Sequence, residues 1–229
     1  MRASGILLPV SSLPGKYGIG SFSEEAYKFV DFLKDSKQQY WQILPIGPTS
    51  YGDSPYQSFS TYAGNPYFIS LEELIEQKLL TEKECDKVDF GNKIDKVDYE
   101  KLYNGRFKLL KKAYKRSNIR EREEFKKFKD ENQYWLNDYA MFMAIKERFK
   151  GQSFDNWAED IKLRWGYSME YYQNELKEEI EFYEFVQYEF YRQWYKLKKY
   201  ANDNGVKIIG DIPIYVAYDS ADVWTNRFD

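Results

Sequence analysis

The chain has 229 residues, a length that predicts one or at most two domains. It carries 34 Lys and Arg against 37 Asp and Glu, and this net charge of −3 gives no electrostatic reason to expect a nucleic-acid partner or an anionic membrane surface. The mean hydropathy is −0.75, and no apolar run approaches the roughly 18 residues that span a bilayer. No secretory apolar segment follows Arg2, so we expect a cytoplasmic globular protein.

Two residue counts exclude much chemistry. The sequence has no His, which excludes a Ser-His-Asp triad, a Cys-His pair and a His-ligated metal built from this chain. Its single cysteine, Cys85, lies in a charged stretch without a base partner, and we expect it to be a bystander. In contrast, 19% of the residues are aromatic, which supplies many flat apolar rings with polar tips.

A β-α-β unit is predicted at the amino-terminal end. The apolar runs at 5–10 and 40–46 are typical of strands buried on both faces. Between them, Ser21 and Glu24 have capping-box spacing and open an amphipathic helix. Its apolar stripe consists of Ala26, Phe29, Val30 and Leu33. Because one helix links the two strands, the strands should be parallel.

A long, charged, helical region follows. One helix is predicted through Trp135 and Tyr139, and a second runs from Phe182 to a stop near Gly205. We expect the aromatic stripe of the second helix to be core packing. A third strand signal follows at 206–216. The predicted fold class is therefore α/β, with a helical insertion between the second and third strands.

These signals divide the chain into three parts. Residues 1–70 hold the first two strands, residues 71–178 the helical insertion, and residues 179–229 the last helix, the third strand and the loop after it. Three strands cannot close a barrel of eight. We therefore expect the sequence to be cut in mid-domain, with exposed apolar strand edges that lower its solubility.

A polar and aromatic loop occupies the stretch from Gly47 to Tyr67. It follows the second strand at its carboxyl end, where α/β proteins place their sites. A sugar suits its mixture of groups, because the C–H face of a sugar stacks on aromatic rings while its hydroxyls need donors and acceptors. An ordinary loop held by tyrosine packing and Asx turns is the alternative. The density of such groups favours the sugar site.

The third strand signal contains a carboxylate, Asp211. Burying a carboxylate costs roughly several kcal/mol unless it is hydrogen-bonded or used, so the structural and functional interpretations of Asp211 stay equal. Asp219 and Asp222 follow on the next loop, with Ser220 as the expected N-cap of a helix.

Four motifs, in this order, resemble the 4-α-glucanotransferase family, the amylomaltases or disproportionating enzymes. They are LPVSSLPGKYGIG at 8–20, YWQILP at 40–45, the highly specific YGDSPYQS at 51–58, and 209–224, which begins IGDIP. The resemblance implies a (β/α)8 barrel of the TIM type with helical insertions, of which only the first three strands are present.

The resemblance also implies a reaction. A segment of α-1,4-glucan is transferred with retention from one maltodextrin to the 4-hydroxyl of another glucan or of glucose, in starch, glycogen or maltose metabolism. This chemistry uses a carboxylate nucleophile and a carboxylic acid about 5–5.5 Å apart. No cofactor or metal is required. The implied partners are a maltodextrin and a glucose acceptor, without nucleic acid or membrane, and the oligomeric state stays open.

The family's binding residues carry over to specific positions. The positions that match the loop lining the donor-side subsites are Tyr51, Ser54, Tyr56 and Gln57. Tyr103 loosely matches a position tied to a secondary glucan site, and Asp211 matches a strand-three carboxylate that supports the active site.

The family's catalytic residues do not carry over. Its nucleophile lies in an Arg-x-Asp-His motif on the fourth strand and its general acid Glu on a later strand, and both are expected beyond Asp229. We therefore assign no catalytic residue and expect this chain alone to be inactive as a glycosyltransferase. A non-catalytic maltodextrin-binding module and one half of a split enzyme are the alternatives.

Overall fold

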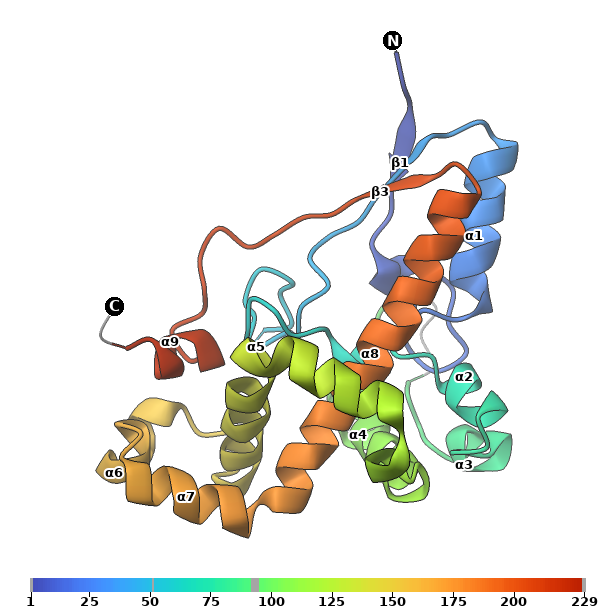
Figure 1. Cartoon of the computed structure of the whole chain (residues 1–229). Helices are drawn as coiled ribbons and strands as arrows, with labels where there is room; N and C mark the ends of the chain where they lie inside the picture. The colour runs from blue at the N-terminus through green and yellow to red at the C-terminus, as the bar shows by residue number, and fades with distance from the viewer. Residues whose placement is uncertain (1, 51, 92–94, 228–229) are drawn as a thin grey trace. The chain divides into compact units, whose positions relative to one another are not determined.

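A computed structural model of the chain describes residues 2–50, 52–91 and 95–227 (Figure 1). Its strands are β1 (Gly5–Leu7), β2 (Tyr40–Gln42) and β3 (Lys207–Ile209). Its α-helices are α1 (Glu24–Asp35), α2 (Leu71–Glu76), α3 (Glu82–Asp86), α4 (Tyr99–Arg116), α5 (Glu123–Arg148), α6 (Glu159–Lys162), α7 (Gly166–Glu175), α8 (Lys177–Asp203) and α9 (Ala221–Thr225). None of the helices in these residues is long and apolar enough to cross a membrane.

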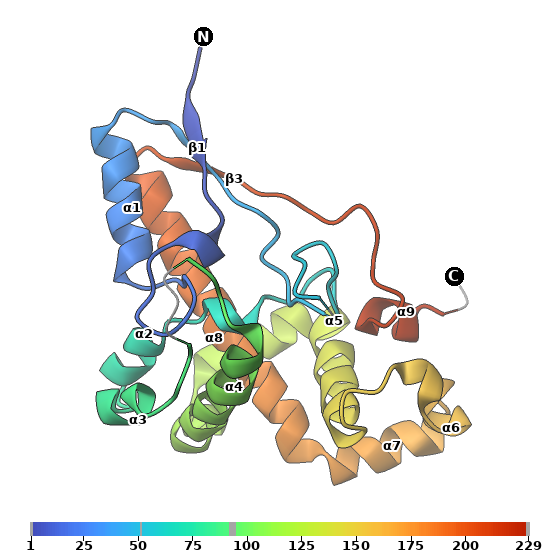
Figure 2. The same cartoon turned by 180° about the vertical axis from the view of Figure 1, so that it is seen from behind.

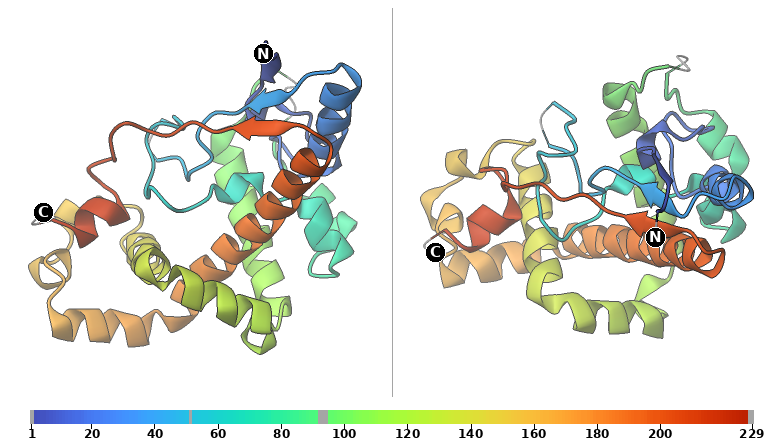
Figure 3. Two further views of the ribbon diagram at one scale, coloured as in Figure 1. Left: turned by 45° about the horizontal axis from the view of Figure 1, so that its top comes forward. Right: turned by 90° about the horizontal axis from the view of Figure 1, so that it is seen from above.

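The strands form one parallel sheet in the order β1-β2-β3 (Figure 3). Trp41, at the centre of β2, pairs with Ile6 of β1 on one side and with Ile208 of β3 on the other. The predicted parallel β-α-β unit is thus confirmed. In the sequence, the helices from α2 to α8 all come between β2 and β3.

The strands are shorter and more exposed than their apolar runs indicate. β1 ends at Leu7 and β3 at Ile209, although the runs continue to residues 10 and 216. In both strands the central residue is partly covered and its neighbours are exposed. The expectation of strands buried on both faces is therefore wrong for β1, and in β2 it holds for Trp41 but not for the exposed Gln42. β1 and β3 are the outer strands of the sheet, whereas β2 between them buries Trp41 completely.

Helix α1 begins at Glu24, with Ser23 as its N-cap. The predicted capping by Ser21 is therefore wrong, because the backbone of Ser23 is the one that turns from extended to helical there. The predicted apolar stripe holds for Ala26, Val30 and Leu33, which are fully buried, while Phe29 is half-buried. Figures 1 and 2 show α1 beside the carboxyl-terminal half of α8, where the rings of Tyr27 and Tyr200 lie 5.1 Å apart.

The two long predicted helices are confirmed. Helix α5 contains Trp135 and Tyr139, and α8 ends at Asp203 with Gly205 just after it at φ 78°. The stripe of α8 is buried, as expected for core packing; Phe182, Phe185, Val186 and Phe190 are at most 2% exposed.

The chain forms two compact units. Unit 1 consists of Met1–Ile46, Asn65–Asn118 and Glu189–Ile212, and unit 2 of Gly47–Gly64, Ile119–Tyr188 and Pro213–Asp229. The core of unit 1 surrounds Trp41, and that of unit 2 surrounds Phe142, whose ring lies 5.5 Å from Trp157 and 5.9 Å from Trp224. The division into 1–70, 71–178 and 179–229 remains a prediction.

Gly20 closes the loop that follows β1, at a point where backbone segments meet. A Cβ there would overlap the carbonyl oxygen of Val10 and lie 2.7 Å from that of Leu13. Since both obstacles are backbone atoms, we predict that Gly20→Ala destabilises the protein by about 1–3 kcal/mol in urea unfolding. Gly210→Ala is the control, because its Cβ would meet nothing within 4 Å. Equal losses in the two variants would contradict the steric explanation.

Candidate functional site

The polar and aromatic loop of unit 2, residues 47–64, folds back on itself. The backbone N–H of Ser50 donates to the carbonyl of Gln57 at 2.9 Å, and the N–H of Gln57 donates to the carbonyl of Ser54 at 3.1 Å. An antiparallel bridge between Thr49 and Ser58 closes the base of this turn. The sequence permits the turn because Gly52, at φ 83°, and Asp53, at φ 55°, adopt the left-handed region.

Three predicted binding residues come together at this turn. The hydroxyl oxygen of Ser54 accepts the backbone N–H of Tyr56 at 3.3 Å. Tyr56 keeps 46% of its surface exposed, and Gln57 beside it is also exposed. The loop therefore offers a ring, an amide and a hydroxyl within four successive residues, the groups that a sugar needs. Tyr51, the fourth predicted residue of this loop, lies outside the described residues.

Hydrogen bonds attach the carboxyl-terminal part of the loop, residues 59–64, to helices of unit 2. The side-chain amide of the fully buried Gln187 on α8 accepts the N–H of Gly64 at 2.7 Å and donates to the carbonyl of Gly64 at 3.0 Å. At α9, the N–H of Ala221 donates to the carbonyl of Phe59 at 2.8 Å, and the carboxylate of Asp222 accepts the N–H of Thr61 at 2.9 Å. The carboxyl-terminal part of the loop is therefore anchored to α8 and α9, while its tip is exposed.

A buried ion pair holds the segment that leads into α9. The ammonium of Lys146 on α5 donates to the carboxylate of Asp219, and Lys146 is only 4% exposed. The other carboxylate oxygen of Asp219 accepts the N–H of Phe154 at 3.1 Å. The same ammonium lies 5.1 Å from the centroid of the Phe59 ring. Lys146 thus joins α5 to both the loop and the segment before α9.

The expected N-cap of the last helix is confirmed. The hydroxyl oxygen of Ser220 accepts the N–H of Val223 at 3.2 Å, which starts α9 at Ala221. Trp224, on the same helix, is 1% exposed and donates its indole N–H to the carbonyl of Ile161 at 3.1 Å. This tryptophan is a core residue of unit 2.

Burial raises the pKa of Asp222, while the hydrogen bond from Thr61 acts in the opposite direction. The folded pKa therefore exceeds the unfolded value of about 3.9. The ionised carboxylate lowers stability above the folded pKa, and this cost disappears as the pH falls through that pKa. Asp222→Asn removes the charge and keeps an oxygen that can accept from Thr61. We predict that the variant is more stable than the parent at pH 7 and that its advantage shrinks toward pH 4. A difference that is constant in urea unfolding at both pH values would contradict this.

The other two predicted residues belong to unit 1. Tyr103 lies on α4 and is 57% exposed, with its ring 5.2 Å from that of Phe107. Asp211 lies two residues beyond the end of β3, and one of its carboxylate oxygens accepts the N–H of Ile212 at 2.9 Å. The prediction that Asp211 is buried within a strand is wrong, because the strand ends earlier and the residue is half-buried.

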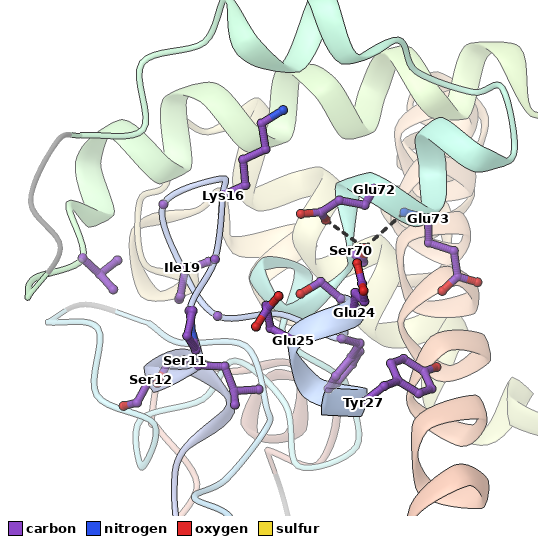
Figure 4. A pocket seen from close by; sticks show the side chains of 18 of the residues that line it. Ser11, Ser12, Lys16, Ile19, Glu24, Glu25, Tyr27, Ser70, Glu72 and Glu73 are labelled. Carbon is purple, nitrogen blue, oxygen red and sulfur yellow. Dashed lines mark hydrogen bonds between the residues drawn. The ribbon is translucent and has the colours of Figure 1, made fainter. Parts of the chain in front are cut away.

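A cavity of about 1370 Å³ lies in unit 1 (Figure 4). The loop after β1 lines one side, and Glu24 and Glu25 from α1 and Glu72 and Glu73 from α2 line the other. The hydroxyl of Ser70 donates to Glu72 at 2.9 Å and accepts the N–H of Glu73 at 3.1 Å. Among the predicted binding residues that the structure describes, none lines this cavity.

The single thiol has no part in the candidate site. Cys85 is buried in α3, and burial raises the pKa of its thiol to about 11, so it stays protonated at neutral pH. In the residues that the structure describes, no cluster of three or more His, Cys, Asp or Glu side chains could hold a metal ion.

Comparison with known proteins gives consistent matches. The sequence profile of the family described as 4-alpha-glucanotransferase, glycoside hydrolase family 77, matches residues 8–228. A 4-alpha-glucanotransferase of Clostridium butyricum is 52% identical over 95% of this chain and 45% of its own length. A 4-alpha-glucanotransferase of Thermus thermophilus is 43% identical over 98% of this chain and 45% of its own length. The structure of the amylomaltase from Streptococcus agalactiae in complex with acarbose superposes with a TM-score of 0.93 at 44% identity, and covers 99% of this chain and 46% of that one.

The parallel β-α-β unit, with a polar loop after the second strand, defines an α/β protein. The matches go further, because they extend over nearly the whole chain. The chain belongs to the 4-α-glucanotransferase family, which confirms the family that its four motifs resemble. It spans about 45% of the length of the curated relatives that it matches.

Sequence reasoning missed the residues that hold the loop in place. Gln187 carried no distinctive signal, because Glu184, Glu189 and Gln193 are also polar residues buried on α8. Lys146 carried none, because its partner Asp219 is 73 residues away in the sequence.

Proposed function

We propose that this chain supplies the amino-terminal, glucan-binding part of a 4-α-glucanotransferase, an enzyme that transfers α-1,4-glucan segments between maltodextrins. The turn of unit 2 that holds Ser54, Tyr56 and Gln57 around one short loop supports this proposal most directly. Such a turn gives a maltodextrin a stacking ring and fixed polar groups. In this proposal Tyr51 completes the donor-side loop, Asp211 supports the reacting sugar, and Tyr103 belongs to a secondary glucan site.

The fold proposal is a (β/α)8 barrel of which this chain forms the first three strands. Its support is the parallel sheet, whose sequential strands lie side by side as in a barrel, and the position of α2 to α8 between β2 and β3. The proposed reaction retains configuration through a glycosyl-enzyme, which needs a carboxylate nucleophile and a carboxylic acid. The chain contains no His and therefore no Arg-x-Asp-His motif, so these 229 residues by themselves are proposed to bind glucan without turnover. The enzyme is proposed to act in the cytoplasm and without a cofactor.

The same observation favours a second candidate, a maltodextrin-binding module without chemistry. The two candidates make the same prediction for binding by this chain. They differ in whether these residues can support transfer when joined to the rest of a family member.

The binding claim can be tested by titrating the chain with maltoheptaose while recording tryptophan fluorescence or heat. We expect saturable binding, and a roughly ten-fold weaker affinity in Tyr56→Ala, equivalent to about 1.4 kcal/mol. Tyr195→Ala is the matched control, because Tyr195 on α8 is similarly exposed, at 57% against 46% for Tyr56. Absence of binding by the folded chain, or equal effects of the two substitutions, would contradict the proposed role of the loop.

A further inference from the structure

Aromatic rings also gather at α7, which contains none of the residues that the proposed function uses. Trp165, just before α7, and Tyr167 and Tyr171 within it are 46%, 62% and 59% exposed. The rings of Trp165 and Tyr167 lie 5.9 Å apart, and Tyr167 and Tyr171 are four residues apart and so face the same side of the helix. We call these three exposed residues the α7 strip.

The α7 strip is not the edge of a packed core. Ser168 is the only buried residue of α7, and its hydroxyl is hydrogen-bonded to the carboxylate of Asp160. One turn later, the ring of Tyr172 lies 6.2 Å from that of Phe149 at the end of α5. Helix α7 is therefore held through the side of the helix that carries Ser168 and Tyr172, while Tyr167 and Tyr171 face solvent. Large aromatic side chains grouped on a surface in this way indicate a binding site.

The backbone that carries the strip is held by Asp160. The N–H of Trp165 donates to the backbone carbonyl of Asp160 at 2.8 Å, and the hydroxyl of Ser168 is hydrogen-bonded to the Asp160 carboxylate. The residues on either side of Gly166 and Tyr167 are thus fixed by the same residue, which lowers the entropy lost when a ligand binds. A Cβ on Gly166 would meet nothing within 4 Å, so the surface beside the backbone between Trp165 and Tyr167 is open.

The surroundings of the strip indicate the kind of ligand. Apart from Gly166, every exposed residue from Trp165 to Glu175 is aromatic or carries a carboxylate or an amide. The polar members are Glu170, Gln173, Asn174 and Glu175. Flat rings bordered by such acceptors and donors, without exposed aliphatic side chains, suit a chain of sugar rings better than the apolar core of a protein interface.

We propose that the α7 strip is a surface site that binds α-1,4-glucan chains, separate from the loop that carries Tyr56. The choice of an α-1,4-glucan rests on the proposed function. A surface strip adds contacts to long chains, because a polymer bound at one site raises the local concentration of its own segments at the other. Short oligosaccharides gain little from it.

Affinity electrophoresis of the full 229-residue chain in gels that contain glycogen tests this site. We expect glycogen to retard the chain, and a Trp165→Ala/Tyr171→Ala double variant to lose at least five-fold in apparent glycogen affinity while its maltotriose affinity is unchanged. Trp165→Phe/Tyr171→Phe keeps flat rings and is expected to retain most of the retardation. Circular dichroism checks that each variant is folded.

The outcomes separate this site from the loop. Unchanged retardation of the folded double alanine variant would overturn the α7 site. So would a variant that loses only the self-association of the chain, because the strip would then be an interface between copies. If the chain does not bind maltotriose but its retardation by glycogen still depends on the strip, the proposed role of the loop is contradicted and the α7 site is supported.

Discussion

Lys146→Met is expected to lower the free energy of unfolding by about 3 kcal/mol, because it leaves the carboxylate of Asp219, whose side chain is only 15% exposed, without its cation. Methionine is one atom shorter and keeps most of the apolar part of the side chain, so the loss reports the ammonium, including its contacts with the rings of Phe59 and Phe142. For a chain of this size, about 3 kcal/mol corresponds to a fall in Tm of roughly 6–12 °C. Thermal and urea unfolding, followed by circular dichroism, measure it.

A double-mutant cycle with Asp219→Asn is the control for this prediction. If the two side chains act as a pair, the double variant loses less stability than the sum of the single variants, with a coupling of about 0.5–3 kcal/mol. Additive losses would show that Lys146 acts through its contacts with the rings and with the carbonyl of Gln152 rather than through Asp219.

Arg106→Ala is expected to cost about 3–5 kcal/mol, since it empties a buried position and leaves two buried carbonyls without a donor. Arg106 lies on α4 and is 1% exposed. Its guanidinium donates to the carbonyl of Tyr17, in the loop after β1, at 3.4 Å and to that of Ile69, just before α2. This one side chain therefore joins three segments of unit 1.

Arg106→Met separates the two parts of that loss. Burial lowers the pKa of the Arg106 guanidinium to about 10, so the charge itself is disfavoured in the fold and its removal offsets part of the cost. Methionine also fills most of the volume, and we expect it to recover about 1–2 kcal/mol relative to alanine. A methionine variant as stable as the parent would show that the hydrogen bonds to Tyr17 and Ile69 contribute nothing.

The parts of the fold that follow from local pattern were predictable. The β-α-β unit and helices α5 and α8 each follow from periodicity over many residues. Strand length was not predictable, because the apolar residues Ile212 and Ile214 continue the pattern of β3 and yet are 79% and 89% exposed. A strand ends where its hydrogen bonding to the neighbouring strand ends. That point depends on the neighbour and cannot be read from the apolar run itself.

The candidate site shows a similar division. The motif at 51–58 identifies the family and the loop, and turn residues such as Gly52 indicate where it bends. The attachments of the loop were beyond reach, because the contact between Thr61 and Asp222 joins residues 161 positions apart and Gln187 reaches Gly64 over 123. Such pairs are set by tertiary packing, and a single sequence carries no signal for them.

The exposed apolar segment after β3 supports the solubility expectation. Ile212, Ile214 and Tyr215 are each at least 79% exposed, within a few residues of one another. Patches of this kind promote association. A sharp, cooperative thermal transition from a monomeric sample would count against it.

The central claim, that these residues are the glucan-binding part of a 4-α-glucanotransferase, is tested most directly by glucose release from maltotriose. The measurement compares this chain alone with a chimera in which it replaces the matching 217 residues of the Clostridium butyricum relative. We expect glucose release by the chimera and none by the chain alone. Glucose release by the chain alone at a rate near that of the chimera, or a folded chimera without activity, would contradict it.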